Sequence, residues 1–264
     1  MADRSIWHSL YIAIIRSLFM SDGSLSSIQN ATKSRAKFSG RGRARGAAGY
    51  VNPSDVSGNY DFVKQSGETQ SISPPEGGFT KIKVGAAWDN LFVEDTALFG
   101  LIKKKRKANI DLDLGCLYEL EDGTRGAIQA FGKLFGKIKE PPYIRLSEDE
   151  RTGDSDGDDE FMMINGRKWP EIKRILVYVY IYDGAMDWAQ VKPQIQIRVP
   201  NQPPIVVTLS AHMKDLGLCV IAGLENVRNG IVVTNYTEYF PGHAEMDRAY
   251  GFGLEWDDGR KSPA

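Results

Sequence analysis

Two acidic stretches contain the residues whose types and spacing point most directly to chemistry. In NIDLDLG, residues 109–115, Asn109, Asp111 and Asp113 alternate with aliphatic residues. Because successive side chains of a β-strand point to opposite faces, the three oxygen-bearing side chains share one face and the aliphatic ones face a core. Two aspartates at this spacing, roughly 7 Å, repel each other unless a cation lies over them. The stretch therefore favours a hard cation held by oxygen.

The second stretch, SEDERTGDSDGDDEFMMI, spans residues 147–164. Residues 148–160 hold eight carboxylates and one arginine, including the closely spaced Asp154, Asp156, Asp158, Asp159 and Glu160. Ca²⁺ takes about six to eight oxygen ligands in flexible geometry, which a glycine-punctuated loop can supply from side chains and backbone carbonyls. The stretch has no local cluster of histidine and cysteine residues, which argues against zinc, copper or iron. A solvated connector is the alternative, and pairing the run with NIDLDLG favours calcium instead.

The sequence carries no recognisable catalytic motif. None of the three histidines lies near a serine or cysteine in a nucleophile setting, and no phosphate-cradling glycine motif is present. Cys116 and Cys219 lie in apolar, strand-like runs, which is typical of small core residues in a reduced compartment, although two strands of one sandwich can bring such residues close enough to pair. We therefore expect a protein that is not an enzyme.

Two basic stretches support an alternative function. Residues 33–45, KSRAKFSGRGRAR, carry six basic groups and no acid, and Arg41, Arg43 and Arg45 resemble the Arg/Gly-rich segments that bind single-stranded nucleic acid. The second, KKKRK at residues 103–107, is expected to be a charge cluster in a loop. A solvated arm and loop is the simpler interpretation, and nucleic-acid or anionic-surface binding is the alternative.

Composition and periodicity divide the chain into four parts. Residues 1–20 have the spacing of an amphipathic helix, or are an extension if translation starts at Met20. Residues 21–78 are rich in Ser, Gly and Arg and predict a disordered arm. Residues 79–258 contain short alternating strands separated by turn residues, which predict an all-β antiparallel sandwich with RILVYVYIY as its central strand and one short helix near HAEMDRAY. The tail, 259–264, is expected to fray.

The order of these motifs resembles a known family. KIKVGAAWD, NIDLDLG, DERTGDSDGDDE and EIKRILVYVYIYDG resemble, over about residues 80–200, the bacterial tellurium-resistance TerD/TerA stress proteins. The C-terminal AYGFGLEWDDGRK is more similar to the TerA branch. The resemblance implies a β-sandwich of the TerD type and a cytoplasmic, Ca²⁺-binding scaffold or sensor. It also implies partners among other stress or tellurite-resistance proteins, with a membrane-associated complex as a further candidate.

The resemblance also implies a set of metal-binding residues. These are Asp111 and Asp113 of the strand and, from the acidic run, Asp149, Asp154, Asp156, Asp158, Asp159 and Glu160. Asn109 stands where the family pattern has an aspartate, and its amide still offers an oxygen. Tellurite is an oxyanion, which a carboxylate-lined pocket repels unless a bound cation overcompensates. Direct capture of tellurite at these residues is therefore disfavoured.

Overall fold

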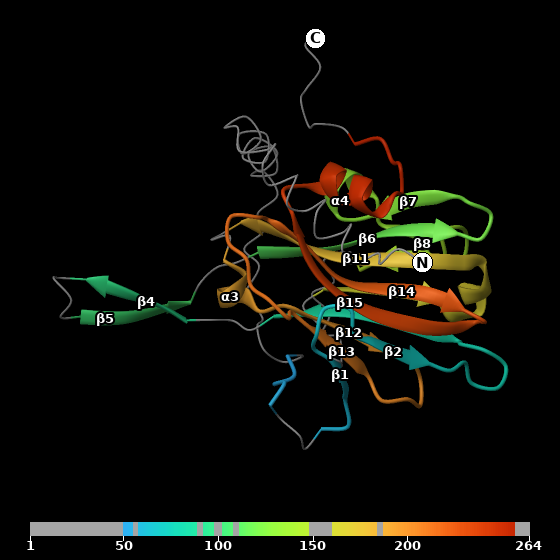
Figure 1. Ribbon diagram of the computed structural model, residues 1–264, viewed down its shortest axis with the longest axis horizontal. Coiled ribbons are helices and arrows are strands. Elements are labelled where there is room, and N and C mark those ends of the chain that lie inside the picture. Colours follow the sequence, from blue (N-terminus) through green and yellow to red (C-terminus); the bar gives the residue numbers. More distant parts are fainter. Residues whose placement is uncertain are drawn as a thin grey trace, which may run out of the picture. The chain divides into compact units, whose positions relative to one another are not determined.

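The computed structural model describes residues 50–54, 58–88, 92–97, 102–107, 111–147, 160–183 and 187–256 (Figure 1). For residues 92–97 and 102–107, and for Asp111, Phe131, Asp183 and Gln190, it describes the backbone only. The chain divides into two units. One comprises residues 43–255 and contains all the described elements, and the other comprises residues 1–42 and 256–264, of which Trp256 is described. The predicted helix at residues 1–20 and the tail at 259–264 lie outside the described residues.

Two β-sheets form the body of the 43–255 unit. The seven-stranded sheet has the order β1 (Asp61–Val63), β13 (Ile205–Thr208), β12 (Gln194–Arg198), β3 (Lys81–Ala87), β10 (Glu160–Asn165), β9 (Ile144–Leu146) and β8 (Gly136–Lys137). The six-stranded sheet has the order β2 (Thr69–Ile72), β15 (Gly230–Phe240), β14 (Leu218–Val227), β11 (Ile172–Asp183), β6 (Asp111–Leu120) and β7 (Arg125–Ile128). The described strands pair antiparallel apart from β1 and β13, which are parallel. The predicted all-β sandwich is confirmed.

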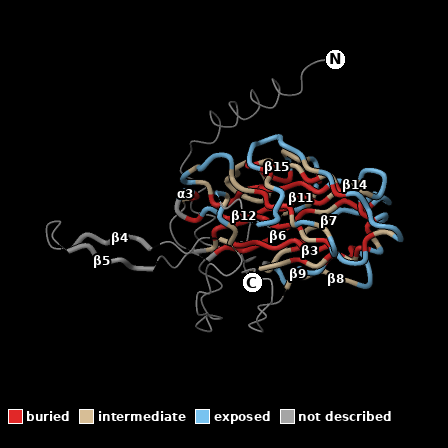
Figure 2. Tube along the Cα trace, turned by 90° about the horizontal axis from the view of Figure 1, so that it is seen from below, coloured by how far each residue is buried: buried red, intermediate tan, exposed pale blue. Residues whose placement is uncertain are grey.

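The core forms between the two sheets, where strands such as β3 and β12 direct apolar side chains inward at every second position. In β3, Ile82, Val84 and Ala86 have no exposed surface and belong to the core cluster, and Lys83 between them is only 4% exposed. The buried parts of the strands lie together in the interior, and exposed residues lie mainly in the outer loops (Figure 2). Two tryptophans are fully buried as well, and each indole finds a backbone acceptor: Trp169 Nε1 donates to Gly230 O at 3.2 Å, and Trp188 Nε1 to Leu216 O at 2.6 Å. Trp169 lies in the 3₁₀-helix η2 (Gly166–Glu171) and Trp188 in α3 (Trp188–Val191).

Strand β11 is the predicted central strand. It pairs with β14 on one side and β6 on the other, and every residue from Ile175 to Ile181 is buried. Its outer face is covered because helix α4 (His243–Tyr250) lies over the six-stranded sheet, where Met246 and the following Phe252 are buried (Figure 1). The helix expected near HAEMDRAY is thus confirmed. None of the helices in the described part of the chain is long and apolar enough to cross a bilayer.

Both cysteines are buried and free. Val177 and Val179 of β11 are the partners of Cys116 on β6 and Cys219 on β14, respectively, so a whole strand separates the two thiols. Two strand spacings amount to about 9.6 Å, which is too far for a disulfide. Burial raises the pKa of both thiols. The prediction that they are small core residues is confirmed.

The strand pattern differs from the sequence-based expectation in two places. Strands β1 and β2 fall within residues 21–78, so the boundary of the expected arm moves toward the N-terminus. Both strands lie at a sheet edge and are only three and four residues long, too short to show a periodic pattern in the sequence. KKKRK is also not in a loop: it lies in β5 (Ile102–Lys107), which pairs with β4 (Phe92–Ala97). Glu94 and Asp95 are register partners of Lys105 and Lys104, and opposite charges in such positions favour pairing.

Candidate metal centre

The NIDLDLG stretch occupies the start of β6 with the predicted alternation. Leu112 and Leu114 are each 1% exposed and belong to the core, whereas Asp113 lies on the opposite face. That face is covered too, since Asp113 is only 7% exposed. Tyr180 of β11 is the direct cross-strand partner of Asp113, and burial, with a smaller contribution from the Asp113 charge, raises the tyrosine's pKa. Asp113 is therefore a buried acid beside aromatic rings.

The last acid of the acidic run meets this strand. Glu160 is the first residue of β10, and its Oε2 accepts a hydrogen bond from the backbone N–H of Leu114 at 2.6 Å. The bond forms at this point because β7 pairs with β6 only over Cys116–Glu119. Among the described strands, none continues that edge of β6 toward Asp111, and a carboxylate supplies the acceptor. The NIDLDLG strand and the last residue of the acidic run, which sequence reasoning paired by their chemistry, therefore meet at this junction.

A further acid, Asp183, lies at the same end of β6. It is the last residue of β11, and its register partner is Asp111, across a β-bulge between Ile181 and Asp183. Like charges in directly opposed positions destabilise a sheet. Sequence reasoning missed Asp183 because only the pairing of two distant strands reveals it. The available signal was an aspartate ending the most apolar strand, in IYDG.

Most of the other predicted site residues lie outside the described residues. These are Asn109, Asp149, Asp154, Asp156, Asp158 and Asp159, together with Arg41, Arg43 and Arg45. Asp111 and Asp183 have described backbone positions only. Within the described side chains, no group of three or more His, Cys, Asp or Glu residues is arranged to hold a metal ion. The calcium site thus stays a prediction, which rests on Asp113, Glu160 and the strand positions of Asp111 and Asp183.

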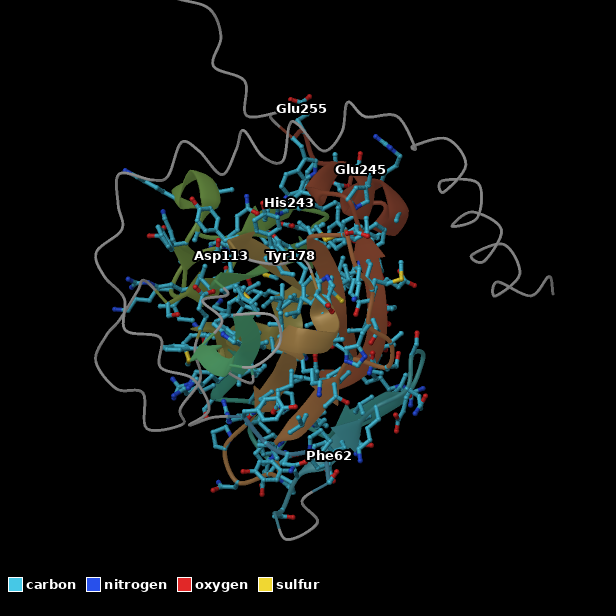
Figure 3. The ribbon with its side chains drawn as sticks, turned by 90° about the vertical axis from the view of Figure 1, so that its left-hand side faces the viewer. Phe62, Asp113, Tyr178, His243, Glu245 and Glu255 are labelled. Atoms are coloured by element: carbon cyan, nitrogen blue, oxygen red, sulfur yellow. The ribbon has the colours of Figure 1, made fainter. Side chains whose placement is uncertain are left out.

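An aromatic layer closes the outer face next to Asp113. The ring of His243, at the start of α4, lies 5.3 Å from the ring of Tyr178 and 5.6 Å from that of Tyr180, by centroids (Figure 3). Burial lowers the pKa of His243 to about 4, so this histidine is neutral at pH 7. Tyr178 donates its hydroxyl hydrogen to Gln129 Oε1 at 2.6 Å, and its ring lies over Gly115. Packed aromatic rings therefore line the outer face of the sheet beside Asp113.

Comparison with known proteins identifies a relative of this chain by sequence. No family model matches the sequence. Over 183 residues it is 38% identical to the protein named Tellurium resistance protein TerA from Alcaligenes sp.. The chain is a TerA-like relative within the tellurium-resistance family. The aligned part is 69% of this chain and 53% of the relative, so the chain spans about half the length of the TerA protein that it matches. The family resemblance of the motifs is confirmed.

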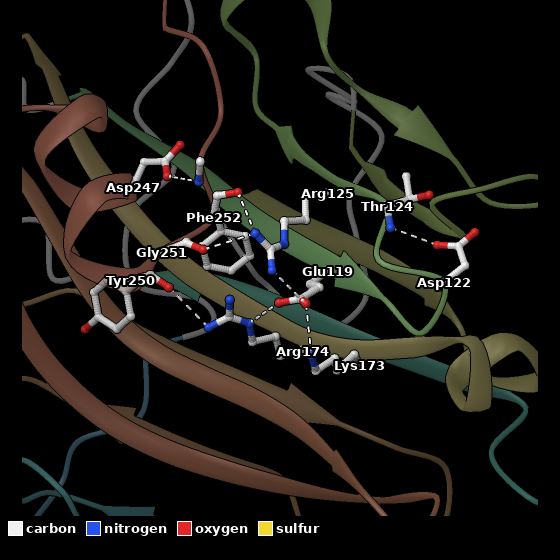
Figure 4. A network of polar contacts seen from close by, with 11 residues as sticks. Glu119, Asp122, Thr124, Arg125, Lys173, Arg174, Asp247, Tyr250, Gly251 and Phe252 are labelled. Atoms are coloured by element: carbon white, nitrogen blue, oxygen red, sulfur yellow. Dashed lines mark hydrogen bonds and ion pairs between the residues drawn. The ribbon is translucent and has the colours of Figure 1, made fainter.

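At its other end, β6 of this TerA-like chain carries an acid of a different kind. Glu119 is 3% exposed and accepts hydrogen bonds from three cations, namely Arg125 at 3.1 Å, Lys173 at 2.9 Å and Arg174 at 2.7 Å (Figure 4). Burial by itself raises the pKa of Glu119, but the hydrogen bonds from Lys173, Arg174 and Arg125 outweigh it and hold the pKa at about 2. The carboxylate is fully neutralised by side chains of the chain itself.

Two of these cations, Arg125 and Arg174, fasten the C-terminal AYGFGL segment to the sheet. Arg174 Nη1 donates to Tyr250 O at 3.2 Å, and Arg125 Nη1 donates to Phe252 O at 3.1 Å. The Arg174 guanidinium also lies 4.3 Å from the centroid of the Phe252 ring. Asp247 closes the turn, because its carboxylate accepts from the N–H groups of Gly253 and Leu254. This TerA-like motif therefore has a structural role as the anchor of α4.

Proposed function

We propose that this TerA-like chain is a tellurite-resistance stress protein that binds Ca²⁺ at the acidic end of β6. The single observation that supports this most is the hydrogen bond from Leu114 N–H to Glu160, because it joins the NIDLDLG strand to the end of the acidic run. Asp113 lies next to that bond in sequence, and Asp111 and Asp183 are register partners at the same strand end. These carboxylates, with acids of the run, would hold the ion.

The donor set fits calcium better than other ions. Carboxylate and backbone oxygens are hard ligands, and Ca²⁺ accepts more of them, with looser geometry, than Mg²⁺ does. When bound, the ion would supply the positive charge that offsets the repulsion between Asp111 and Asp183. Glu160 would then couple the ion to the junction of the two sheets through Leu114.

We further propose a scaffold or sensor role without catalysis, in the cytoplasm. Three described groups of the kinds used in acid–base or nucleophilic work are committed to packing: His243 is buried beside two tyrosine rings, and burial raises the pKa of the thiols of Cys116 and Cys219. A calcium-ordered acidic end would present a surface to other stress or tellurite-resistance proteins, including a membrane-associated complex. The anionic charge of tellurite argues against its direct capture there.

Thermal unfolding with and without Ca²⁺ tests the metal proposal. A ligand that binds only the folded state at a hundredfold excess over its Kd stabilises it by about 2.7 kcal/mol. For a domain of this size we expect Tm to rise by about 5 to 10 °C with Ca²⁺ and by less with Mg²⁺. Asp113→Asn should lose most of this rise. Glu76→Gln, which removes one exposed carboxylate elsewhere, should keep it. An unchanged Tm in calcium would contradict the proposal.

The cellular role needs its own experiment. In a host made tellurite-sensitive by loss of its own copy of this gene, the wild-type chain should restore growth on tellurite. Asp113→Asn should restore it poorly at equal protein level, whereas Glu76→Gln should act like the wild type. Equal growth with all three would separate tellurite resistance from the acidic end of β6.

A further inference from the structure

A polar relay runs along the outer face of β12, which belongs to the seven-stranded sheet and not to the sheet that contains β6. Ile195 and Ile197 of β12 point into the core, so Gln194, Gln196 and Arg198 share the outer face. Arg198 Nη2 donates to Gln196 Oε1, and Gln196 Nε2 donates to Gln194 Oε1 at 2.7 Å. Both glutamines have no exposed surface. A guanidinium can only donate hydrogen bonds, so the oxygen of the Gln196 amide must face Arg198, and its nitrogen then faces Gln194.

The relay ends on a backbone segment from elsewhere in the chain. Gln194 Oε1 accepts from the N–H of Val51 at 3.0 Å, and Gln194 Nε2 donates to the C=O of the same residue at 2.9 Å. One side-chain amide thus meets both polar groups of a single residue, as a neighbouring strand would. Such a contact recognises the backbone of an extended segment, whatever its side chain is. Buried amides without these partners would be costly, so the site is built for a peptide.

A second anchor lies on the other side of β13. Lys64, directly after β1, donates from Nζ to Pro53 O at 3.1 Å. Since β13 lies between β12 and β1, residues 51–53 are anchored on both sides of that strand. Val206, the outward-facing residue of β13 between the two anchors, has no exposed surface. The segment therefore crosses the outer face of the seven-stranded sheet.

We propose that Gln194 is a peptide-backbone clamp whose occupant is the chain's own segment 50–53, and that the clamp is the point where the N-terminal arm is fastened to the sandwich. Arg45 precedes Tyr50 by five residues, and five extended residues span at most about 18 Å. The clamp thereby keeps Arg45, the last residue of the Arg/Gly-rich stretch, within about 18 Å of the clamped segment. This inference does not depend on calcium binding.

Amide hydrogen exchange on the full-length chain tests the clamp. Gln194→Met keeps the shape of the side chain and removes both hydrogen bonds, so exchange of the Val51 N–H should accelerate at least tenfold. The amides of Ile195 and Ile197 should stay protected. Gln202→Met is the matched control, because Gln202 also donates to a backbone carbonyl, that of Ser73, but lies outside the relay. Unchanged Val51 exchange in Gln194→Met would overturn the proposal.

A second pair of variants does not alter β12 at all. Val51→Pro removes the backbone N–H that donates a hydrogen bond to Gln194 Oε1, whereas Val51→Ala keeps both backbone groups. Trypsin cleavage after Arg45 should therefore be several-fold faster in Val51→Pro and unchanged in Val51→Ala. Equal rates in the two variants would contradict a backbone clamp. Protection of Val51 that increases with protein concentration would assign the segment to a second copy, and would overturn the assignment to the same chain.

Discussion

The acids at the two ends of β6 have opposite kinds of cross-strand partner on β11, although they lie on the same face of the strand. At one end, Glu119 is the register partner of Arg174 and has two further cations within hydrogen-bond distance. At the other end, Asp111 is the register partner of Asp183, and Asp113 lies two residues away. One end pairs acid with base, and the other pairs acid with acid.

This difference separates a structural charge cluster from a candidate binding site. The buried carboxylate of Glu119 is neutralised by arginine and lysine side chains of the same chain. Two of these, Arg125 and Arg174, also anchor the end of α4 and the segment that follows it. Opposed aspartates at the acidic end lower stability unless a cation joins them. Register thus places acid opposite acid at one end of β6 and acid opposite base at the other, and a bound cation would offset the repulsion at the acidic end.

The largest change in the free energy of unfolding is expected at the end of β6 that contains Glu119. Glu119→Gln leaves Arg125, Lys173 and Arg174 without their shared carboxylate, and breaking such a partly buried cluster should lower the free energy of unfolding by about 3 kcal/mol. Urea denaturation measures this change. Glu140→Gln, which removes the exposed partner of Lys137, should leave the unfolding curve unchanged. Equal effects of the two variants would show that the Glu119 cluster has no special role.

The same cluster predicts a pH dependence. The pKa of Glu119 is about 2 in the folded chain and near its usual value of 4.5 in the unfolded chain. The unfolded state therefore binds the proton first as the pH falls. The stability that Glu119 contributes is complete above about pH 4.5 and is lost progressively toward pH 2. The difference in stability between wild type and Glu119→Gln should shrink over this window, and a constant difference would contradict the assignment.

A smaller loss is expected midway between the two ends. A Cβ atom at Gly115 would lie 2.4 Å from the ring of Tyr178, which is below any normal contact. Gly115→Ala should therefore cost about 2 kcal/mol through displacement of the ring. Combining it with Tyr178→Leu should cost less than the sum of the two single changes. Calorimetric Tm values of the three variants measure this, and simple additivity would rule out the contact as the cause.

The smallest effect should have the opposite sign. In metal-free buffer, Asp183→Asn removes the repulsion with Asp111 and should raise the free energy of unfolding by about 0.5 kcal/mol. With saturating Ca²⁺ the order should reverse, because the wild type gains more from the ion. Urea denaturation with EGTA and with Ca²⁺ gives both values. A variant that is less stable than wild type without metal would show that the Asp111–Asp183 pairing is not repulsive.

The sequence predicted the parts of the fold that depend on local pattern. RILVYVYIY was identifiable as the central strand because an unbroken run of aliphatic and aromatic residues follows Arg174. NIDLDLG was identifiable as a two-faced strand because its residues alternate. Strand β2, TQSI, lacked such a signal, since only its last residue, Ile72, is apolar and its position depends on pairing with β15. The strand in KKKRK was missed because its charges resemble a solvated loop, while its pairing depends on β4.

The candidate site was predictable in its chemistry and not in its full membership. Asp113 and Glu160 were chosen as oxygen donors, and the structure brings Glu160 to the residue after Asp113. Asp183 and the cations around Glu119 were missed because register between distant strands determines both. The same holds for the clamp at Gln194, whose partner Val51 lies in the expected arm.

Calorimetric titration of Ca²⁺ into metal-free wild type and Asp183→Asn tests the central claim most directly. If the acidic end of β6 requires a cation, the wild type should bind Ca²⁺ with measurable heat. Asp183→Asn should bind it at least tenfold more weakly, and Glu76→Gln should match the wild type. The absence of heat in the wild type, or equal affinity in Asp183→Asn and Glu76→Gln, would contradict the account.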